Sequence, residues 1–299
     1  CIYCLDDCAD KGAAKIGRAC TVNPFSGLEN EFKIRPATKA KKICIIGGGP
    51  AGMQAALILL SRGHNVELFE KSLKLGGQFK LADLPPFKSE VAEANRFLIH
   101  QIKQCGVKVN LGYQVTADDI QHDRPDVLVL ATGSKPVKPK IPGIDREFVY
   151  SARDFLGNNV QVGNEVLIIG GGSLSGEVAD ILAGDHNVTI VEKLDSILSD
   201  MKSLIRQELL ERLKNKGIAI LTSSTVAEIG VDSVKIKNDD GKIVEIKTDN
   251  VIYAVGNRSD SNLKAATKDM PEVFIIGDAL RPSNLGNALR NAVKTAIVI

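Results

Sequence analysis

The stretch that decides the fold is KICIIGGGPAGMQAALILLSRGHNVELFEK, residues 42–71. Its apolar runs predict strands over Ile43–Ile46 and Val66–Glu70. The segment between them predicts a glycine turn followed by a helix over Ala51–Arg62, which Gly63 ends. A strand, a glycine turn, a helix and a second strand in this order are typical of a βαβ unit in a parallel sheet.

The glycine turn has the spacing of a dinucleotide-binding motif. Gly47, Gly49 and Gly52 fill the pattern GxGxxG. In that motif the first glycine permits the tight turn, the second lets a pyrophosphate approach the backbone, and the third lets helix and strand pack closely. The following helix N-terminus offers free N–H groups and a partial positive charge. Glu70 lies about 20 residues further on, where a carboxylate accepts the ribose hydroxyls.

A second copy of the pattern is EVLIIGGGSLSGEVADILAGDHNVTIVEK, residues 165–193. It predicts strands over Val166–Ile169 and Val188–Glu192 with a helix over Leu174–Leu182 between them. The chain therefore holds an internal duplication. The fold class we expect is α/β, with two Rossmann-like dinucleotide-binding domains, the second inserted in the first, and a small N-terminal cysteine cluster segment.

The second glycine turn departs from the pattern at one position. Gly170 and Gly172 match, but Ser175 replaces the third glycine. A small residue is tolerated there, with slightly wider packing of helix against strand. Glu192 closes the second strand, and its carboxylate would repel a 2′-phosphate, which favours NADH over NADPH. The neighbouring Lys193 weakens that preference, and a decayed nucleotide fold stays open as an alternative.

Apolar strands mark the limits of the two domains: VLVLA over residues 127–131, VIYAV within 251–260 and VFII within 273–279. We expect a cysteine segment and linker over 1–41, a first domain over 42–148 and 265–299, and an inserted domain over 149–264.

Composition excludes several partners. The 299 residues carry a net charge of +2, which gives no basic surface suited to nucleic acid or an anionic membrane. There is no apolar run of about 18 residues and no visible signal peptide. We therefore expect a cytoplasmic protein, with a homo-oligomer left open.

The chain opens with CIYCLDDCADKGAAKIGRAC, which places Cys1, Cys4, Cys8 and Cys20 in the spacing C-x2-C-x3-C-x11-C. Disulfides, a tetrahedral zinc site and a [4Fe–4S] cluster are the alternatives for four such thiols. The spacing alone leaves zinc and iron–sulfur open. We expect the isolated Cys44 and Cys105 to be packing residues, and the acidic side chains Asp6, Asp7 and Asp10 to be solvated.

The two glycine turns, LGGQ at residues 75–78, ATG at 131–133 and IIGDA at 275–279 together resemble the two-dinucleotide-binding flavoproteins. The resemblance implies that the first domain holds FAD and that the inserted domain holds the nicotinamide nucleotide. It also implies that Asp278 contacts the ribityl or pyrophosphate region of FAD.

The cysteine spacing, followed by VNP at 22–24 and GGGPAG, resembles bacterial 2,4-dienoyl-CoA reductase and 2-enoate reductase. Trimethylamine dehydrogenase is a relative with a different cysteine spacing. The resemblance implies a [4Fe–4S] cluster on the four cysteines and an FMN-bearing (β/α)8 barrel ahead of them. Since the chain starts at Cys1, we expect it to be the back half of such an enzyme, with that barrel as its partner in the same polypeptide.

These motifs give the expected site residues. The expected FAD contacts are Gly47, Gly49, Pro50, Ala51, Gly52, Glu70, Lys71, Gly77, Gln78, Val115, Ala131, Thr132, Gly133, Gly277 and Asp278. The expected nicotinamide nucleotide contacts are Gly170, Gly172, Ser173, Leu174, Ser175, Glu192 and Gly256. The expected metal ligands are Cys1, Cys4, Cys8 and Cys20. We expect no catalytic proton donor, because the first hydride step needs none.

A flavin accepts a hydride and releases single electrons, so it can connect a nicotinamide with an iron–sulfur cluster. The expected function is hydride transfer from NADH to FAD, then single-electron transfer to the cluster and to FMN, which reduces an activated C=C bond. A disulfide reductase of the thioredoxin reductase kind needs a CxxC inside either unit, where none exists. An electron-input subunit like that of glutamate synthase usually has two sets of four cysteines. A docking module that binds only ADP stays open because of Ser175.

Overall fold

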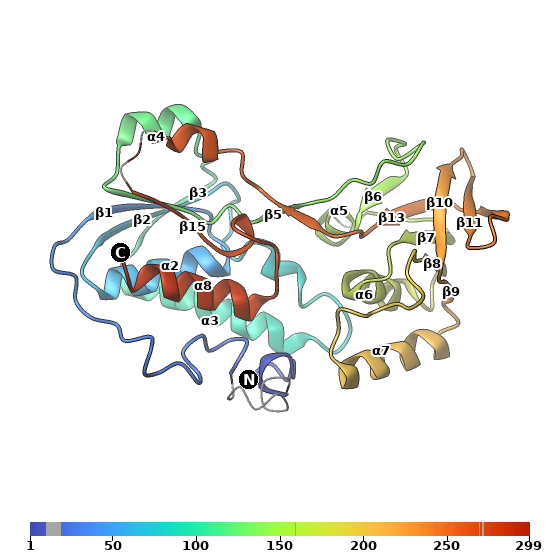
Figure 1. Cartoon of the computed structure of the whole chain (residues 1–299), viewed down its shortest axis with the longest axis horizontal. Helices are drawn as coiled ribbons and strands as arrows, with labels where there is room; N and C mark the ends of the chain where they lie inside the picture. Colours follow the sequence, from blue (N-terminus) through green and yellow to red (C-terminus); the bar gives the residue numbers. More distant parts are fainter. Residues whose placement is uncertain (10–18, 159, 269, 271) are drawn as a thin grey trace. The chain divides into compact units, whose positions relative to one another are not determined.

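The computed structural model describes residues 1–9, 19–158, 160–268, 270 and 272–299. It divides into two compact units (Figure 1). Unit 1 comprises Cys1–Asp83, Ser89–Lys135 and Arg258–Ile299, and unit 2 comprises Leu84–Lys88 and Pro136–Asn257. The chain thus leaves unit 1 after residue 135 and returns at 258, earlier than the boundaries expected from sequence. Both crossings fall in the paired strands β5 (Ser134–Pro136) and β14 (Asn257–Ser259).

Unit 1 is built on a parallel sheet, five-stranded in the part of the chain that the structure describes, with the order β15-β4-β1-β2-β3. Its strands are β1 (Lys42–Ile46), β2 (Asn65–Glu70), β3 (Lys108–Leu111), β4 (Val127–Leu130) and β15 (Val273–Ile275). Its helices are α2 (Pro50–Ser61), η1 (Gly77–Leu81), α3 (Ser89–Cys105), α4 (Ala117–Asp123), η2 (Lys264–Thr267), η3 (Gly277–Ala279) and α8 (Leu285–Ala296).

The central strands of this sheet are buried on both faces. Ile43 and Ile45 of β1 pack against α2, α3 and α8, which lie on one face (Figure 1). Cys44 and Ile46 point the other way, into a cluster with Ile120 of α4. Burial on both faces explains the continuous apolar runs in the sequence. It also raises the pKa of the Cys44 thiol to about 12, as expected for a packing residue.

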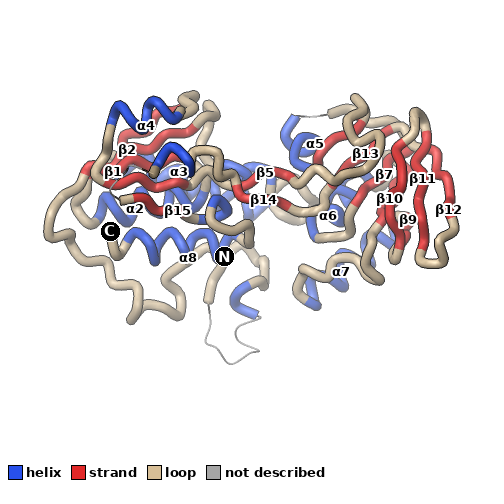
Figure 2. The backbone as a smooth tube through the Cα atoms, turned by 45° about the horizontal axis from the view of Figure 1, so that its top comes forward, coloured by secondary structure: helices blue, strands red, loops and turns tan. Residues whose placement is uncertain are grey.

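Unit 2 repeats this plan with the order β6-β13-β7-β8-β9, counted over its described residues. The sheet strands are β6 (Val149–Ser151), β7 (Glu165–Ile169), β8 (Asn187–Val191), β9 (Ala219–Leu221) and β13 (Asn250–Tyr253). The helices are α5 (Ala152–Asn158), α6 (Ser173–Leu182) and α7 (Ser203–Asn215). An antiparallel sheet is added by β10 (Ser224–Ile229), β11 (Ser233–Asn238) and β12 (Ile243–Lys247) (Figure 2).

Alternating side chains give the sheet of unit 2 two different coverings. Val166 and Ile168 of β7 pack against the helices α5, α6 and α7. Leu167 and Ile169 pack against Ile229 and other residues of the antiparallel sheet. The matching positions of β1 and β7 within two parallel sheets confirm the predicted duplication and fold class. No helix in the described ranges is long and apolar enough to span a membrane.

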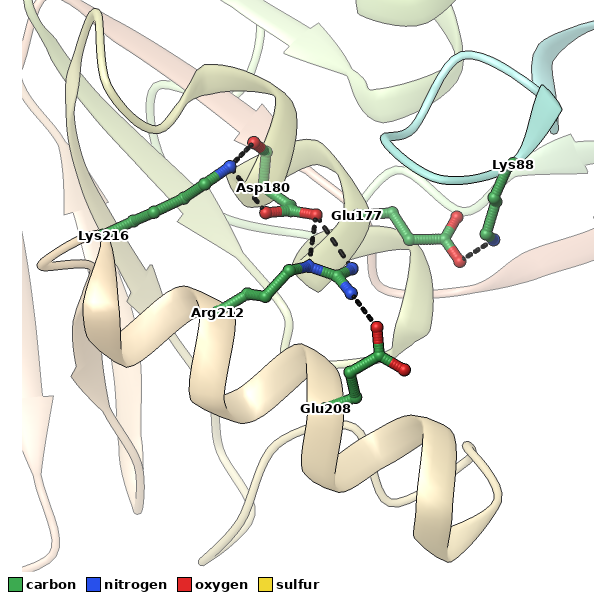
Figure 3. Close-up of polar contacts among 6 residues, drawn as sticks. All are labelled: Lys88, Glu177, Asp180, Glu208, Arg212 and Lys216. Atoms are coloured by element: carbon green, nitrogen blue, oxygen red, sulfur yellow. Dashed lines mark hydrogen bonds and ion pairs between the residues drawn. The ribbon is translucent and has the colours of Figure 1, made fainter.

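A buried carboxylate ties α6 to α7 (Figure 3). The Asp180 side chain is 1% exposed, and its Oδ2 lies 3.0 Å from Nη2 of Arg212. Its Oδ1 lies 2.8 Å from Nζ of Lys216. Arg212 also pairs with Glu208 one turn earlier on α7. Because a buried carboxylate is stable only when it is paired, these contacts fix the position of α6 within unit 2.

The segment Leu84–Lys88 belongs to unit 2, although the chain on both sides of it belongs to unit 1. Lys88 forms an ion pair with Glu177 of α6 (Figure 3). The guanidinium carbon of Arg212 lies 5.0 Å from the centre of the Phe87 ring, a cation–π distance. Both contacts connect the segment to helices of unit 2.

Candidate dinucleotide-binding sites

The first glycine turn has the geometry that its sequence predicts. Gly47 has a φ of +116°, and a Cβ there would lie 2.2 Å from the carbonyl oxygen of Ala131. A Cβ at Gly52 would lie 1.9 Å from the carbonyl oxygen of Gly47. By contrast, a Cβ at Gly49 would meet only the Cα of Gly77, at 4.0 Å, among the residues that the structure describes. The fold therefore requires Gly47 and Gly52, whereas Gly49 keeps its backbone open to a ligand.

The start of α2 lies beside a motif from the other end of the chain. Gly49 is the N-cap of α2 without a capping side chain, and Pro50 occupies the first helical turn. Gly277 has a φ of +60°, and a Cβ there would lie 2.7 Å from Cβ of Ala51. The IIGDA motif therefore packs on the same helix start as the glycine turn. A helix N-terminus of this kind favours an anionic group.

Three motifs that are distant in sequence meet through a chain of hydrogen bonds. Nε2 of Gln78 donates to Oγ of Ser134 over 3.0 Å. Oγ of Ser134 donates to Oδ2 of Asp278 over 3.0 Å. Gly133 has a φ of +78°, and a Cβ there would lie 3.6 Å from Nε2 of Gln78. The structure thus joins LGGQ, ATG and IIGDA at one place. Ser134 was missed by the sequence analysis, although it directly follows ATG.

The other two residues of ATG, Ala131 and Thr132, are held by hydrogen bonds within unit 1. The backbone N–H of Ala131 donates to the carbonyl of Ile46 over 2.8 Å, which holds the end of β4 beside β1. Oγ1 of Thr132 donates to the carbonyl of Asp260 over 2.7 Å. These bonds hold ATG in place beside the glycine turn.

Glu70 is a buried carboxylate with two backbone partners. Its Oε2 accepts from Gly48 N–H over 2.7 Å, and its Oε1 accepts from Ser72 N–H over 2.8 Å. An ionised carboxylate has about four acceptor positions, so two stay available for ribose hydroxyls. The predicted contacts Lys71, with an exposed side chain, and Val115, packed in a core cluster, stay predictions.

Unit 2 reproduces the first turn almost bond for bond. Gly170 has a φ of +104°, and a Cβ there would lie 2.7 Å from the carbonyl oxygen of Ala254. The Glu192 carboxylate accepts from the N–H groups of Gly171 and Leu194, as Glu70 does in unit 1. Gly256 has a φ of +108°, and a Cβ there would have no neighbour within 4 Å among the described residues. A second turn of the dinucleotide-binding type therefore connects β7 to α6 in unit 2.

Ser175 takes the place of the third glycine and is fully buried. Its Oγ has no hydrogen-bond partner among the residues that the structure describes. The adjacent Gly176 would place a Cβ 2.6 Å from Cδ2 of Leu198. Leu174 is half-buried and packs on the core below α6. The position of Ser175 therefore accepts a Cβ but gives its hydroxyl no partner in the described part of the protein.

Ser175→Ala is expected to stabilise unit 2 by about 1 kcal/mol, because it removes a buried hydroxyl that lacks a partner. Urea unfolding monitored on both variants measures the difference. Ser203→Ala, at an exposed position at the start of α7, is the control and should give no comparable gain. A less stable Ser175→Ala variant would show that the hydroxyl makes a stabilising bond.

The N-terminus of α6 carries a carboxylate that the sequence analysis did not single out. Oδ1 of Asp200 accepts from the Ser173 N–H over 2.9 Å, and Oδ2 lies 3.1 Å from the same nitrogen. Oγ of Ser173 donates to Oδ2 over 2.7 Å. A Cβ at Gly172 would lie 3.6 Å from Oδ2. Asp200 thus lies on the nucleotide turn, brought there by the loop after β8.

The four clustered cysteines are all free thiols. Cys1 and Cys8 are exposed, whereas Cys4 and Cys20 are half-buried. The Tyr3 N–H donates to Sγ of Cys1 over 3.4 Å. In the described part of the chain, no three His, Cys, Asp or Glu side chains are gathered so that they could hold a metal ion. The described residues do not bring the four thiols together, and the four metal ligands stay a prediction.

Two of the acidic residues beside the cysteines, Asp6 and Asp7, bond to other side chains, although we expected them to be solvated. Asp7 is buried, and its Oδ2 and Oδ1 accept from Arg290 of α8 over 2.8 and 3.0 Å. Oγ1 of Thr21 donates to the same carboxylate over 3.2 Å. Asp6 accepts from Nδ2 of Asn284 over 2.9 Å. The prediction for Asp7 was wrong, because its cationic partner is distant in sequence. Asp10 lies outside the described residues.

Residues 41–296 match the pyridine nucleotide-disulphide oxidoreductase family. NADH oxidase of Thermoanaerobacter brockii is 37% identical over 93% of this chain and 44% of that protein. Bilirubin reductase of Mediterraneibacter gnavus is 33% identical over 100% of this chain and 47% of that protein. Cinnamate reductase of Clostridium sporogenes is 33% identical over 99% of this chain and 45% of that protein. The chain spans less than half the length of each of these relatives.

A solved structure of 2-naphthoyl-CoA reductase in complex with 2-naphthoyl-CoA matches with a TM-score of 0.95 and 36% identity. The match covers 100% of this chain and 46% of that chain. Lactococcus lactis thioredoxin reductase matches with a TM-score of 0.69 at 21% identity, which shows the shared fold alone. Its relatives include NADH oxidase, cinnamate reductase and 2-naphthoyl-CoA reductase, and the chain belongs to the pyridine nucleotide-disulphide oxidoreductase family.

Proposed function

We propose that this chain transfers a hydride from NADH, bound in unit 2, to FAD, bound in unit 1. The observation that carries the proposal is the repeated turn, in which Gly47 with Glu70 and Gly170 with Glu192 have matching geometry. Two such turns in one family member suit a reaction between two dinucleotides. The family match over residues 41–296 supports the same pair of ligands.

The residues of unit 1 would hold FAD in three ways. The open backbone at Gly49 and the start of α2 suit its pyrophosphate, and Glu70 suits its adenosine ribose. The bonded set of Gln78, Ser134 and Asp278 would position the remainder of the cofactor. When bound, FAD supplies the ability to accept a hydride and to release electrons singly. No side chain needs to donate a proton for the hydride step.

The residues of unit 2 favour NADH over NADPH. Glu192 directly follows β8, and two backbone N–H groups hold its carboxylate in place. A 2′-phosphate beside it would meet like charge. Gly170 and Gly172 would bind the pyrophosphate. Lys193 has an exposed side chain, and the Glu192 carboxylate would still repel a 2′-phosphate.

The proposal extends to a larger protein. We infer that the chain is the electron-input half of an NADH-dependent reductase whose other half, an FMN-bearing barrel, reduces an activated C=C bond. Relatives more than twice as long support this, since they include a cinnamate reductase and a 2-naphthoyl-CoA reductase. A cytoplasmic location accords with this role.

A [4Fe–4S] cluster on Cys1, Cys4, Cys8 and Cys20 is part of the proposal for the complete enzyme. Four thiols are the donor set that such a cluster uses, and the relatives' matches extend over this segment. Since the thiols are not gathered in the described structure, no step of the reaction is derived through the cluster.

Thiol labelling tests this assignment. At about pH 8, iodoacetamide should modify the metal-free chain at Cys1 and Cys8, which are exposed, and leave Cys44 unmodified. The reason for the second result is that burial raises the pKa of the Cys44 thiol to about 12. After anaerobic reconstitution, about four iron atoms per chain should protect all four clustered cysteines. Iron binding without such protection would contradict the assignment.

A docking module that binds only ADP is the second candidate. The observation that favours it is the Asp200 carboxylate on the turn of unit 2, together with Ser175. The purified, FAD-loaded chain tests the choice through NADH-dependent reduction of ferricyanide. Turnover with NADH exceeding that with NADPH supports hydride transfer, whereas no turnover despite bound FAD favours the docking module.

A further inference from the structure

The two nucleotide turns differ at the carboxylate of Asp200. In both units the segment after the second strand docks on the glycine turn through one backbone bond. Gly76 N–H donates to the Gly48 carbonyl over 2.9 Å in unit 1, and Leu198 N–H donates to the Gly171 carbonyl over 2.6 Å in unit 2. Two residues beyond these donors come Gln78 and Asp200.

The side chains at these equivalent positions behave differently. Gln78 is bonded to Ser134, and the residue against Gly49 is Gly77, which has no side chain. Asp200 instead bonds the first residue of α6 with both of its oxygens. The first residue of α2 is Pro50, which has no N–H to donate, whereas the first N–H of α6 in unit 2 donates to the Asp200 carboxylate.

Asp200 occupies an N–H donor at a helix start, which is a general binding place for a pyrophosphate. Ser173 supplies the first N–H of α6, next to Gly172, the second glycine of the turn. Backbone N–H groups at such a helix start, together with the helix dipole, are the usual ligands of a dinucleotide phosphate. Two anions cannot share one N–H donor at this distance without repulsion.

We propose that Asp200 is a residue that sets the affinity of unit 2 for its pyridine nucleotide. Its carboxylate and the nucleotide pyrophosphate compete for the Ser173 N–H and for the positive end of α6. The inference rests on the proposed function, in which the nucleotide binds at this turn. Asp200 is exposed on a loop, so its side chain can turn into solvent when a pyrophosphate enters. The pyridine nucleotide therefore binds unit 2 more weakly, and dissociates faster, than it would without the Asp200 carboxylate.

Substitution of Asp200 tests the competition. ADP-ribose, which carries the pyrophosphate without the nicotinamide, should bind the Asp200→Ala variant about tenfold more tightly than the unaltered chain, a difference of about 1.4 kcal/mol. Asp200→Asn keeps the shape of the side chain and should show a smaller gain. Adenosine, which has no phosphate, should bind all variants equally. Titration calorimetry on the FAD-loaded chain measures each affinity.

A matched control separates the local effect from the change in net charge. Asp195→Asn removes one negative charge from the same loop, where its Oδ1 accepts from Ser196 rather than from Ser173. This variant should bind ADP-ribose as the unaltered chain does. Inorganic pyrophosphate should raise the melting temperature of Asp200→Ala more than that of Asp195→Asn.

Three outcomes decide the matter. Tighter binding of ADP-ribose by both Asp200 variants supports the inference. Unchanged or weaker binding by Asp200→Ala, with the unaltered chain binding normally, overturns the inference and leaves the proposed function intact. If no protein, altered or unaltered, binds ADP-ribose or NADH, the proposed function fails and the inference fails with it.

Discussion

The variant Gly52→Ala is expected to lose more than about 4 kcal/mol of unfolding free energy in unit 1 and to bind no FAD. A Cβ at this position would lie 1.9 Å from the carbonyl oxygen of Gly47 and 3.3 Å from Cβ of Ala131. Both neighbours belong to the turn and the adjacent strand end, so neither can rotate away. Urea unfolding and the flavin content of the purified chain measure the two losses.

Gly49→Ala is the matched control for this prediction. Gly49 has a φ of −76°, which any residue adopts, and a Cβ there has 4.0 Å of clearance. We expect the Gly49→Ala chain to fold with nearly full stability but to bind FAD weakly, because the methyl group blocks the approach of the pyrophosphate. Equal stability losses in the two variants would contradict the division of the glycines into one required by the fold and one required by the ligand.

The variant Arg290→Met is expected to cost about 3–5 kcal/mol locally, because it leaves a buried carboxylate without its cation. The side chains of Arg290 and Asp7 are 11% and 7% exposed. Asp7 lies between Cys4 and Cys8, and its partner Thr21 follows Cys20. Losing Arg290 should therefore release the cysteine segment from α8. Hydrogen exchange and limited proteolysis of the first residues of the chain would report this release.

Two further variants separate the charge effect from the loss of packing. Asp7→Leu combined with Arg290→Met removes both charges and should be more stable than Arg290→Met alone. Lys138→Met breaks an exposed ion pair with Asp145 and should leave the segment protected. If the double variant releases the segment as fully as the single one, the unpaired charge of Asp7 is not the cause of the release.

The βαβ units could be predicted closely from sequence because their signals are local. The predicted strand over Ile43–Ile46 is observed as Lys42–Ile46, and the predicted helix over Leu174–Leu182 as Ser173–Leu182. The roles of Gly47 and Gly52 follow from the motif and are confirmed by the close backbone contacts. For the strand and the helix, the residues that decide the structure are neighbours in the chain.

Features that depend on distant partners could not be predicted. Asp7 is of a residue type that is usually exposed, and only the fold brings it to Arg290. Asp200 follows an ordinary loop, and only the docking of Leu198 on Gly171 places it at the start of α6. Ser134 links Gln78 with Asp278 because three separate segments meet at one end of the sheet.

The domain crossings also depend on distant partners. The boundaries expected from sequence lie at 148/149 and 264/265, whereas the units separate at 135/136 and 257/258. Pairing between β5 and β14 decides the crossing point, and these two strands are far apart in the chain. Leu84–Lys88 joins unit 2 through side-chain contacts that no local pattern reveals.

The central claim is that pyridine nucleotide bound in one unit reduces the flavin bound in the other. The most direct measurement mixes the FAD-loaded chain anaerobically with one equivalent of NADH and follows the visible flavin absorption. The account predicts that this absorption bleaches as one NAD+ forms per FAD. The Gly49→Ala chain, which binds FAD weakly, should show less bleaching, in proportion to its bound FAD. Persistent flavin absorption, with FAD and NADH both shown to be bound, would contradict the account.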